Sequence, residues 1–253
     1  MNKLSVYLCG QKYFGAEVLT AILDAGHRVA GVSSPAWRNE RLPLSDPSPG
    51  CGPDRLRSAA ERSAIPWRPA GALRASDLPA GVDLIVAAHS HDFIGRPARR
   101  AARLGAIGYH PSLLPLHRGR DAVRWAVRMR DRITGGTVFW LSDNVDAGPI
   151  AAQDWCFIRP DDTAEELWRR DLAPMGVRLL VEVLGQAAVG RIVAVPQPAE
   201  LASWEPALDT APMPRPELPA IGPGVGDTVV TGDADKLARG FGLLRAAMYD
   251  EIA

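Results

Sequence analysis

Residues 4–33 read Leu-Ser-Val-Tyr-Leu-Cys-Gly-Gln-Lys-Tyr-Phe-Gly-Ala-Glu-Val-Leu-Thr-Ala-Ile-Leu-Asp-Ala-Gly-His-Arg-Val-Ala-Gly-Val-Ser. The apolar run over residues 4–9 ends at a glycine, as a buried parallel strand does. Apolar residues then recur at helical spacing over residues 14–25, and Gly26 ends that helix. Residues 27–33 form a second apolar run. This strand–helix–strand opening predicts an α/β fold, with an open and mostly parallel sheet flanked by helices.

The same patterns extend the prediction along the chain. Further strands are predicted at residues 83–88, 106–109, 136–141 and 150–158, and further helices at residues 55–63 and 120–130. A capping-box signature at residues 161–166 predicts a long helix that runs to about Leu184, with a kink or break at Pro174.

The ends of the chain differ in composition. We place one α/β domain over residues 1–190 and a short C-terminal extension over residues 191–253, in which proline and glycine are dense. The extension should end in a helix capped by Asp233 or Asp235. Residues 35–54, rich in Pro, Ser and Gly, are predicted to form a mobile surface loop.

Composition excludes several classes of protein. The formal net charge is zero, and residues 194–253 hold nine acidic and four basic residues, a net charge of about −5 that disfavours contact with nucleic acid. The three scattered cysteines fit a reduced, cytoplasmic protein, and no spacing of His and Cys suggests a metal site. No apolar run approaches the roughly 20 residues that a membrane span needs, so no membrane partner is expected.

Two later segments carry groups suited to proton transfer. Residues 108–119 read Gly-Tyr-His-Pro-Ser-Leu-Leu-Pro-Leu-His-Arg-Gly, and residues 146–150 read Asp-Ala-Gly-Pro-Ile. His110 follows a predicted strand, and Asp146 lies in a loop between two predicted strands. An imidazole and a carboxylate in such places can move protons during attack on a carbonyl. Taken singly, His110 could instead be a buried histidine that ties down its loop, and Asp146 a turn residue.

Together these segments resemble the folate-dependent formyltransferases, a family that includes the transformylases of purine synthesis, of initiator methionyl-tRNA and of amino sugars. The family pattern is Asn-x-His-(Pro/Ala/Gly)-Ser-Leu-Leu-Pro with a later Asp-x-Gly. This chain has the match at residues 110–115, followed by Arg118-Gly119 and by Asp146-Ala147-Gly148. The resemblance covers about residues 3–190 and implies the Rossmann-like formyltransferase fold. Its opening is more similar to the tRNA and amino-sugar branches than to the purine branch, because it lacks the purine branch's Gly-Ser-Asn phosphate cradle.

The resemblance implies three catalytic positions. His110 would move protons at the attacking amine, and Asp146 would set the charge of the imidazole. Gly108 stands where the family has a catalytic asparagine, whose amide donates to the oxyanion. Losing one such donor costs roughly a hundredfold to a thousandfold in rate.

Three explanations for Gly108 stay open. His89, Ser90 or His91, at the end of the neighbouring strand, could supply the missing donor, and we favour a histidine. The Tyr109 hydroxyl could contribute, although strand alternation points it away from His110. The chain could also bind its ligand without normal formyl transfer. A glycine would further leave room for a water molecule or for the substrate.

The resemblance also implies which residues of this chain line a folate pocket. One wall is expected from His89, Ser90, His91 and Phe93, and the opposite wall from Asp143 and Asn144. Ser112, Arg118 and Gly119 are expected at the substrate, although the Ser112 hydroxyl is equally suited to capping its loop and Arg118 to facing solvent. Ligands of open α/β sheets bind at the carboxyl ends of strands, where these residues are predicted to lie.

The predicted function is formyl transfer from 10-formyltetrahydrofolate, a co-substrate, to the amine of a small molecule. The acidic, proline-rich extension disfavours a tRNA substrate. The alternatives are a hydrolase that gives the formyl group to water and a folate-binding paralogue with weakened or lost catalysis. The sequence leaves the acceptor and a homodimer open.

Overall fold

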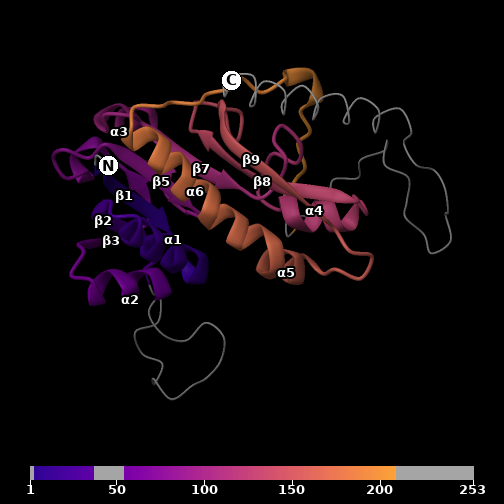
Figure 1. The fold of residues 1–253 in the computed structure, drawn as a ribbon, viewed down its shortest axis with the longest axis horizontal. Helices are drawn as coiled ribbons and strands as arrows, with labels where there is room; N and C mark the ends of the chain where they lie inside the picture. The colour runs from indigo at the N-terminus through magenta and orange to yellow at the C-terminus, as the bar shows by residue number, and fades with distance from the viewer. Residues whose placement is uncertain (1–2, 37–53, 209–253) are drawn as a thin grey trace, which may run out of the picture.

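The computed structural model describes residues 3–36 and 54–208 of the 253-residue chain. Its centre is a seven-stranded sheet in the order β3-β2-β1-β5-β7-β8-β9 (Figure 1). The strands are β1 (Ser5–Gly10), β2 (Arg28–Ser34), β3 (Trp67–Pro69), β5 (Leu84–Ala88), β7 (Ala106–His110), β8 (Ile133–Trp140) and β9 (Ile150–Phe157). The first five in this order pair in parallel, and β8 and β9 are antiparallel. The predicted mostly parallel sheet is confirmed.

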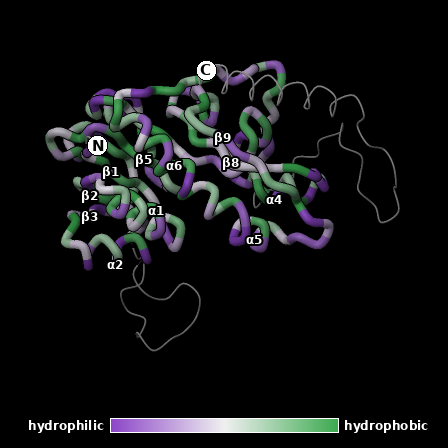
Figure 2. The backbone as a smooth tube through the Cα atoms, in the orientation of Figure 1, coloured by the Kyte–Doolittle hydropathy of each residue, from purple (hydrophilic) through white to green (hydrophobic). Residues whose placement is uncertain are grey.

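Helices cover both faces of the sheet, as the opening segment predicted. The helices are α1 (Lys12–Asp24), α2 (Arg55–Arg62), α3 (Arg96–Ala101), α4 (Ala122–Arg128), α5 (Ala164–Leu167) and α6 (Ala173–Ala188). The larger buried cluster joins α1 and α6 to one face, and a smaller cluster joins α3 to the other. Hydrophobic segments gather in the central strands, whereas α5 and the turns beside it are hydrophilic (Figure 2).

The predicted long helix is divided before Pro174. Thr163 and Glu166 form the expected capping box at the start of α5. A π-helical turn, Trp168–Leu172, separates α5 from α6, and Pro174 lies in the first turn of α6. This agrees with the predicted break, because proline cannot donate the backbone hydrogen bond that a continuous helix requires there.

Several short elements were not predicted. These are α3, β3 and a small parallel pair formed by β4 (Ala72–Leu73) and β6 (Phe93–Ile94), with single 3-10 turns at Ala75–Asp77 and Ala199–Leu201. Strand β8 also begins three residues before the predicted start at residue 136. These elements are short, and their apolar pattern is too brief to separate strand from loop. The greater part of the predicted loop at 35–54 and the predicted last helix lie outside the described residues.

Residues 191–208 run along the domain rather than away from it. The backbone groups of Val195 and Ile150 bond to each other at 2.7 and 2.8 Å, and Trp140 Nε1 donates to the Val193 carbonyl oxygen at 2.7 Å. The division of the chain at residue 190 stays a prediction. Within residues 3–36 and 54–208, no helix has the length and apolar character needed to cross a membrane.

Candidate active site

His110 is the last residue of β7 and is buried at the carboxyl end of the parallel sheet. Its Nδ1 lies 3.7 Å from Asp146 Oδ2, although the two residues are far apart in the sequence. The structure thus brings together the two residues that the sequence singled out. At 3.7 Å the atoms are slightly too far apart for a direct hydrogen bond, and they attract each other only when the ring is protonated.

The other ring nitrogen of His110 has a fixed partner. Nε2 lies 2.7 Å from the carbonyl oxygen of His117. A carbonyl oxygen only accepts, so Nε2 must carry the hydrogen. In the neutral ring the lone pair is therefore on Nδ1, the nitrogen that faces Asp146. This arrangement makes Nδ1 the proton-accepting atom of the site.

Asp146 is held by its own loop and by the loop that follows His110. Its backbone is left-handed, with φ of 51°, and its Oδ2 accepts a hydrogen bond from the Gly119 amide at 2.9 Å. Gln197 donates to the backbone carbonyls of Asp146 and Gly148 at 2.9 and 2.7 Å. Its Oε1 accepts from the Arg118 guanidinium at 2.7 Å. Gly119 thus bonds to the carboxylate directly and Arg118 supports Gln197, while contact of these two residues with substrate stays a prediction.

Ser112 is also used within the protein. Its hydroxyl donates to the Leu116 carbonyl at 2.6 Å, which agrees with the loop-capping interpretation. Thr137 ties the same loop to β8, since its hydroxyl donates to the Ser112 carbonyl and accepts from the Leu114 amide. The loop after His110 is therefore anchored on both sides of its turn.

Gly108 is bordered by hydrocarbon. A Cβ added there would lie 3.1 Å from Leu141 Cδ2 and 3.4 Å from Phe139 Cε1. An asparagine would need Leu141 to shift by a few tenths of an ångström. The three atoms nearest to such a Cβ are all carbon, so the immediate surroundings of Gly108 are apolar.

Two of the substitutes considered for the missing amide point elsewhere. The Tyr109 hydroxyl donates to the Leu172 carbonyl at 2.6 Å, so the expectation that strand alternation turns Tyr109 away is confirmed. The His89 ring centroid lies 6.0 Å from that of Trp168, which also contacts Tyr109. His89 therefore faces the Tyr109 side of the sheet. Burial, followed by the charges of Lys12 and His91, lowers the pKa of His89.

The other residues predicted to form the first wall of the folate pocket differ in whether they are free to contact a ligand. The Ser90 hydroxyl donates to the buried Asp92 carboxylate at 3.0 Å, and Ser33 donates to the same carboxylate at 2.7 Å. His91 is exposed, and Phe93 is 74% exposed, so both can meet a ligand. Asp92 was not among the predicted site residues, and the structure gives it the task of shaping this loop.

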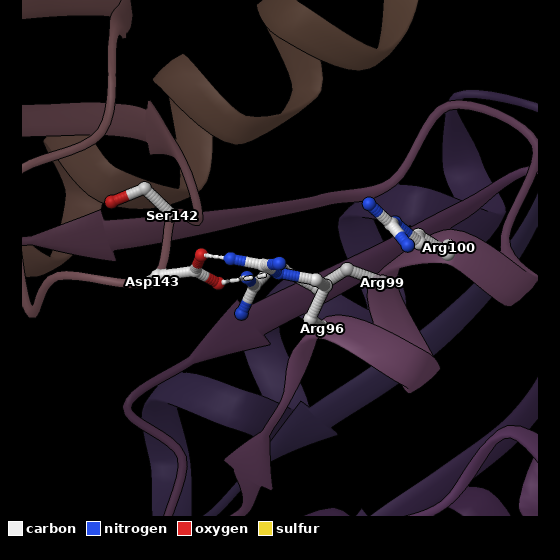
Figure 3. Close-up of a pocket in the computed structure, with 5 residues that line it drawn as sticks. All are labelled: Arg96, Arg99, Arg100, Ser142 and Asp143. Carbon is white, nitrogen blue, oxygen red and sulfur yellow. Dashed lines mark hydrogen bonds and ion pairs between the residues drawn. The ribbon is translucent and has the colours of Figure 1, made fainter.

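The predicted opposite wall lies beside an open pocket of about 500 Å³ (Figure 3). The pocket is lined by Arg96, Arg99, Arg100, Ser142 and Asp143. Asp143 forms ion pairs with Arg96 and Arg99, which join its loop to α3. Asn144 accepts a hydrogen bond from the Ser142 hydroxyl through its carbonyl oxygen. The three arginines give this pocket a positive charge beyond what Asp143 neutralises.

A buried charged cluster near the site was missed by the sequence analysis. His117, Asp131 and Glu205 form it: His117 Nε2 lies 2.8 Å from Asp131 Oδ2, and its Nδ1 lies 3.1 Å from Glu205 Oε2. Burial favours the neutral ring, but the two carboxylates outweigh burial and raise the pKa of His117 to about 9. His117 was visible in the motif, but nothing in the sequence marks its two distant partners.

The described residues hold no group of His, Cys, Asp and Glu arranged to bind a metal ion. Burial raises the pKa of the Cys9 thiol strongly and that of Cys156 to about 11, so neither is a ready nucleophile at neutral pH.

Comparison with known proteins agrees with this geometry. Residues 68–184 match the family model for formyl transferase. The chain is also 33% identical over 213 residues to the methionyl-tRNA formyltransferase of Lactobacillus delbrueckii subsp. bulgaricus, covering 82% of this chain and 65% of that protein. Over residues 68–184 the chain thus carries a formyl transferase domain.

Other proteins similar to this chain are longer. The mitochondrial 10-formyltetrahydrofolate dehydrogenase of Mus musculus is 36% identical over 214 residues, which cover 81% of this chain and 22% of that protein. The chain thus spans about a fifth of the length of this curated relative.

Solved structures share the fold at low identity. Glycinamide ribonucleotide transformylase 1 from Symbiobacterium toebii has a TM-score of 0.58 and 24% identity, over 77% of this chain and 94% of that chain. The N-formyltransferase from Helicobacter canadensis, in complex with folinic acid and dTDP-3-aminofucose, has a TM-score of 0.62 and 15% identity, over 80% and 70%. These likenesses establish the Rossmann-like formyltransferase fold.

Proposed function

We propose that this chain moves the formyl group of 10-formyltetrahydrofolate to the amine of a small molecule. The observation that carries the proposal is the approach of His110 Nδ1 to Asp146 Oδ2 at the carboxyl end of the sheet, in a chain that carries a formyl transferase domain. The donor is supported by relatives named for 10-formyltetrahydrofolate and by the folinic acid complex of a protein with the same fold.

His110 and Asp146 would handle the proton of the acceptor. As the amine nitrogen bonds to the formyl carbon, the bond from that carbon to the donor nitrogen breaks, so the amine loses a proton and the donor nitrogen gains one. Nδ1 of neutral His110 is placed to take the first proton, because Nε2–H is committed to His117. The Asp146 carboxylate would stabilise the resulting imidazolium, and the 3.7 Å gap should shorten once the ring is charged.

Two features suit the donor. The exposed Phe93 ring offers an apolar face to a flat heterocycle, and the pocket of Arg96, Arg99 and Arg100 offers positive charge to the acidic end of the folate. The pocket adjoins the loop that carries Asp146, because Asp143 of that loop pairs with Arg96 and Arg99. The group that faces the developing oxyanion in place of the family asparagine is then His91 or a backbone amide of residues 89–93.

The acceptor is proposed to be a small amine. Two proteins with this fold are named for such acceptors, glycinamide ribonucleotide and an amino sugar nucleotide. One relative acts on methionyl-tRNA, but the net negative charge of residues 194–253 disfavours a tRNA here. A cytoplasmic location and a homodimer stay predictions.

Turnover of the Asp146→Asn variant tests this proposal. The chain is mixed with 10-formyltetrahydrofolate, with and without a panel of small amines, and release of tetrahydrofolate is followed. We expect release that depends on an amine and that falls about a hundredfold or more in Asp146→Asn, since acid–base groups contribute at least that much. Asp154→Asn, which removes a surface carboxylate paired with Arg178, is the matched control and should keep full activity.

The other functions are outcomes of the same assay. Equal release with and without amines would indicate a hydrolase. Binding of the donor without release would indicate a paralogue that has lost catalysis.

A further inference from the structure

We infer that His117 is a positioning residue for His110, and that Asp131 and Glu205 hold it in that role. The inference rests on the proposed function of His110 as the proton acceptor. It assigns a task to a buried charged cluster that the proposed reaction does not otherwise use.

The link between the two histidines is a backbone carbonyl. The His117 carbonyl oxygen lies 2.7 Å from His110 Nε2, and it is the partner that keeps the hydrogen on Nε2 and the lone pair on Nδ1. His117 itself has a left-handed backbone, with φ of 53°. That conformation is unfavourable for a residue with a side chain, so surrounding contacts must impose it.

The side chain of His117 provides those contacts. His117 as a whole is 8% exposed, and its ring lies between Asp131 and Glu205. Asp131 follows α4 and is one-third exposed, whereas Glu205 comes from the C-terminal segment and is almost fully buried. Asp131 accepts a hydrogen bond from Nε2, and the Glu205 carboxylate lies beside Nδ1 as an ion-pair partner without a hydrogen bond, so the two carboxylates hold the imidazolium from opposite sides of the ring.

The C-terminal segment that carries Glu205 also forms hydrogen bonds with the backbone of the loop that carries His117. Ser203 Oγ accepts from the His117 amide at 2.8 Å, and the Ser203 carbonyl accepts from the Arg118 amide at 3.1 Å. The Ser203 amide donates to the Pro115 carbonyl at 3.2 Å. The loop whose carbonyl orients His110 is therefore held by Ser203, which lies 86 positions after His117 in the chain.

Loss of the contacts that Asp131, Glu205 and Ser203 make with His117 should change the chemistry of His110 and not only the stability of the loop. If the His117 carbonyl turns away, His110 Nε2 loses its acceptor and the hydrogen can move to Nδ1. A ring protonated on Nδ1 cannot take the proton of the amine. The expected effect is a lower kcat with little change in the KM for the donor, because the residues proposed to bind the donor are untouched.

The test uses His117→Gln, Glu205→Gln and Asp131→Asn in the full chain, with His27→Gln as the control. His27 is a second buried histidine, and its Nδ1 accepts from the Leu4 amide at 3.3 Å in the first strand region. Nitrogen-15 NMR of the histidine rings reports which nitrogen of His110 carries the hydrogen. Turnover of 10-formyltetrahydrofolate with an accepted amine reports kcat and KM.

We expect wild-type His110 to carry its hydrogen on Nε2 and the cluster variants to show a mixture of tautomers. Their kcat should fall about tenfold to a hundredfold, with the KM for the donor within about twofold of wild type. The double variant His117→Gln/Glu205→Gln should lose no more kcat than the more damaging of the two single substitutions, because both changes disrupt the same cluster. His27→Gln should change neither readout.

A folded Glu205→Gln or Asp131→Asn chain in which the tautomer and kcat of His110 both stay at wild-type values would overturn the inference. These two substitutions preserve shape, so they cover the case in which His117→Gln does not fold. Absence of turnover in the wild-type chain would instead count against the proposed function, while the ring spectra would still decide whether the cluster positions His110.

Discussion

Raising the pH from 6.5 to 8.5 should weaken the fold, because the folded chain keeps a proton on His117 that the unfolded chain releases in this range. Its pKa is raised from 6.5 to about 9 in the folded chain. A group with a raised pKa stabilises the fold fully below its unfolded value, and this contribution is lost as the pH rises through the folded value. The window for His117 therefore runs from about pH 6.5 to about pH 9.

The size of the loss follows from the two pKa values. Linkage between protonation and folding gives a decrease of about 2 kcal/mol in the free energy of unfolding between pH 6.5 and 8.5. Other groups with shifted pKa values act outside this interval. The lowered pKa values of His27 and His89 affect stability below about pH 6.5, and the raised values of the buried thiols matter above about pH 8.5.

Urea unfolding at pH 6.5, 7.5 and 8.5, followed by circular dichroism, measures this loss. The wild-type chain should lose about 2 kcal/mol over the series, and His27→Gln should follow the same slope. His117→Gln should not show it, because the titrating ring is gone. A wild-type free energy of unfolding that stays level or rises between pH 6.5 and 8.5 would refute the reasoning.

Three further substitutions test other parts of the structure. A Cβ at Gly148 would meet a backbone oxygen at 1.7 Å, so Gly148→Ala should cost at least about 3 kcal/mol in urea unfolding, whereas Gly71→Ala, whose Cβ meets nothing within 4 Å, should cost little. Tyr109→Phe should cost about 0.5–1.5 kcal/mol, because it removes one buried hydrogen bond, and should keep turnover within twofold; a large loss of turnover would make its hydroxyl part of the site. Arg100→Ala should raise the KM for the donor severalfold with kcat unchanged. The control Arg103→Ala, which removes an arginine paired with a carboxylate outside the pocket, should leave that KM unchanged. Equal effects of the two substitutions would show that the pocket does not bind the donor.

The sequence was a good guide to the sheet because its strands are long and buried. Runs such as residues 4–9 and 83–88 are almost wholly apolar, and β1 and β5 lie within a residue or two of the predicted bounds. Elements of two or three residues, such as β4 and β6, were missed because their pairing depends on contacts made elsewhere. Gly71, for example, accepts from the Phe93 amide, an interaction that no local pattern encodes.

The site could be predicted only in part for the same reason. The motif pointed to His110 and Asp146, and the structure brings them within 3.7 Å. Gln197, which donates to the Asp146 carbonyl, and Glu205, which pairs with His117, lie in a proline-rich segment with no motif of its own. Their importance comes from a polar side chain that meets a distant backbone or ring, which only the folded chain shows.

The fate of a labelled formyl carbon tests the central claim most directly. The wild-type chain is given 10-formyltetrahydrofolate labelled with carbon-13 in the formyl group together with a panel of small amines, and the products are followed by carbon NMR. We predict that the label appears as a formamide on one amine, and that His110→Asn abolishes this signal. Label that stays on the donor, or that becomes formate at the same rate whether or not an amine is present, would contradict the account.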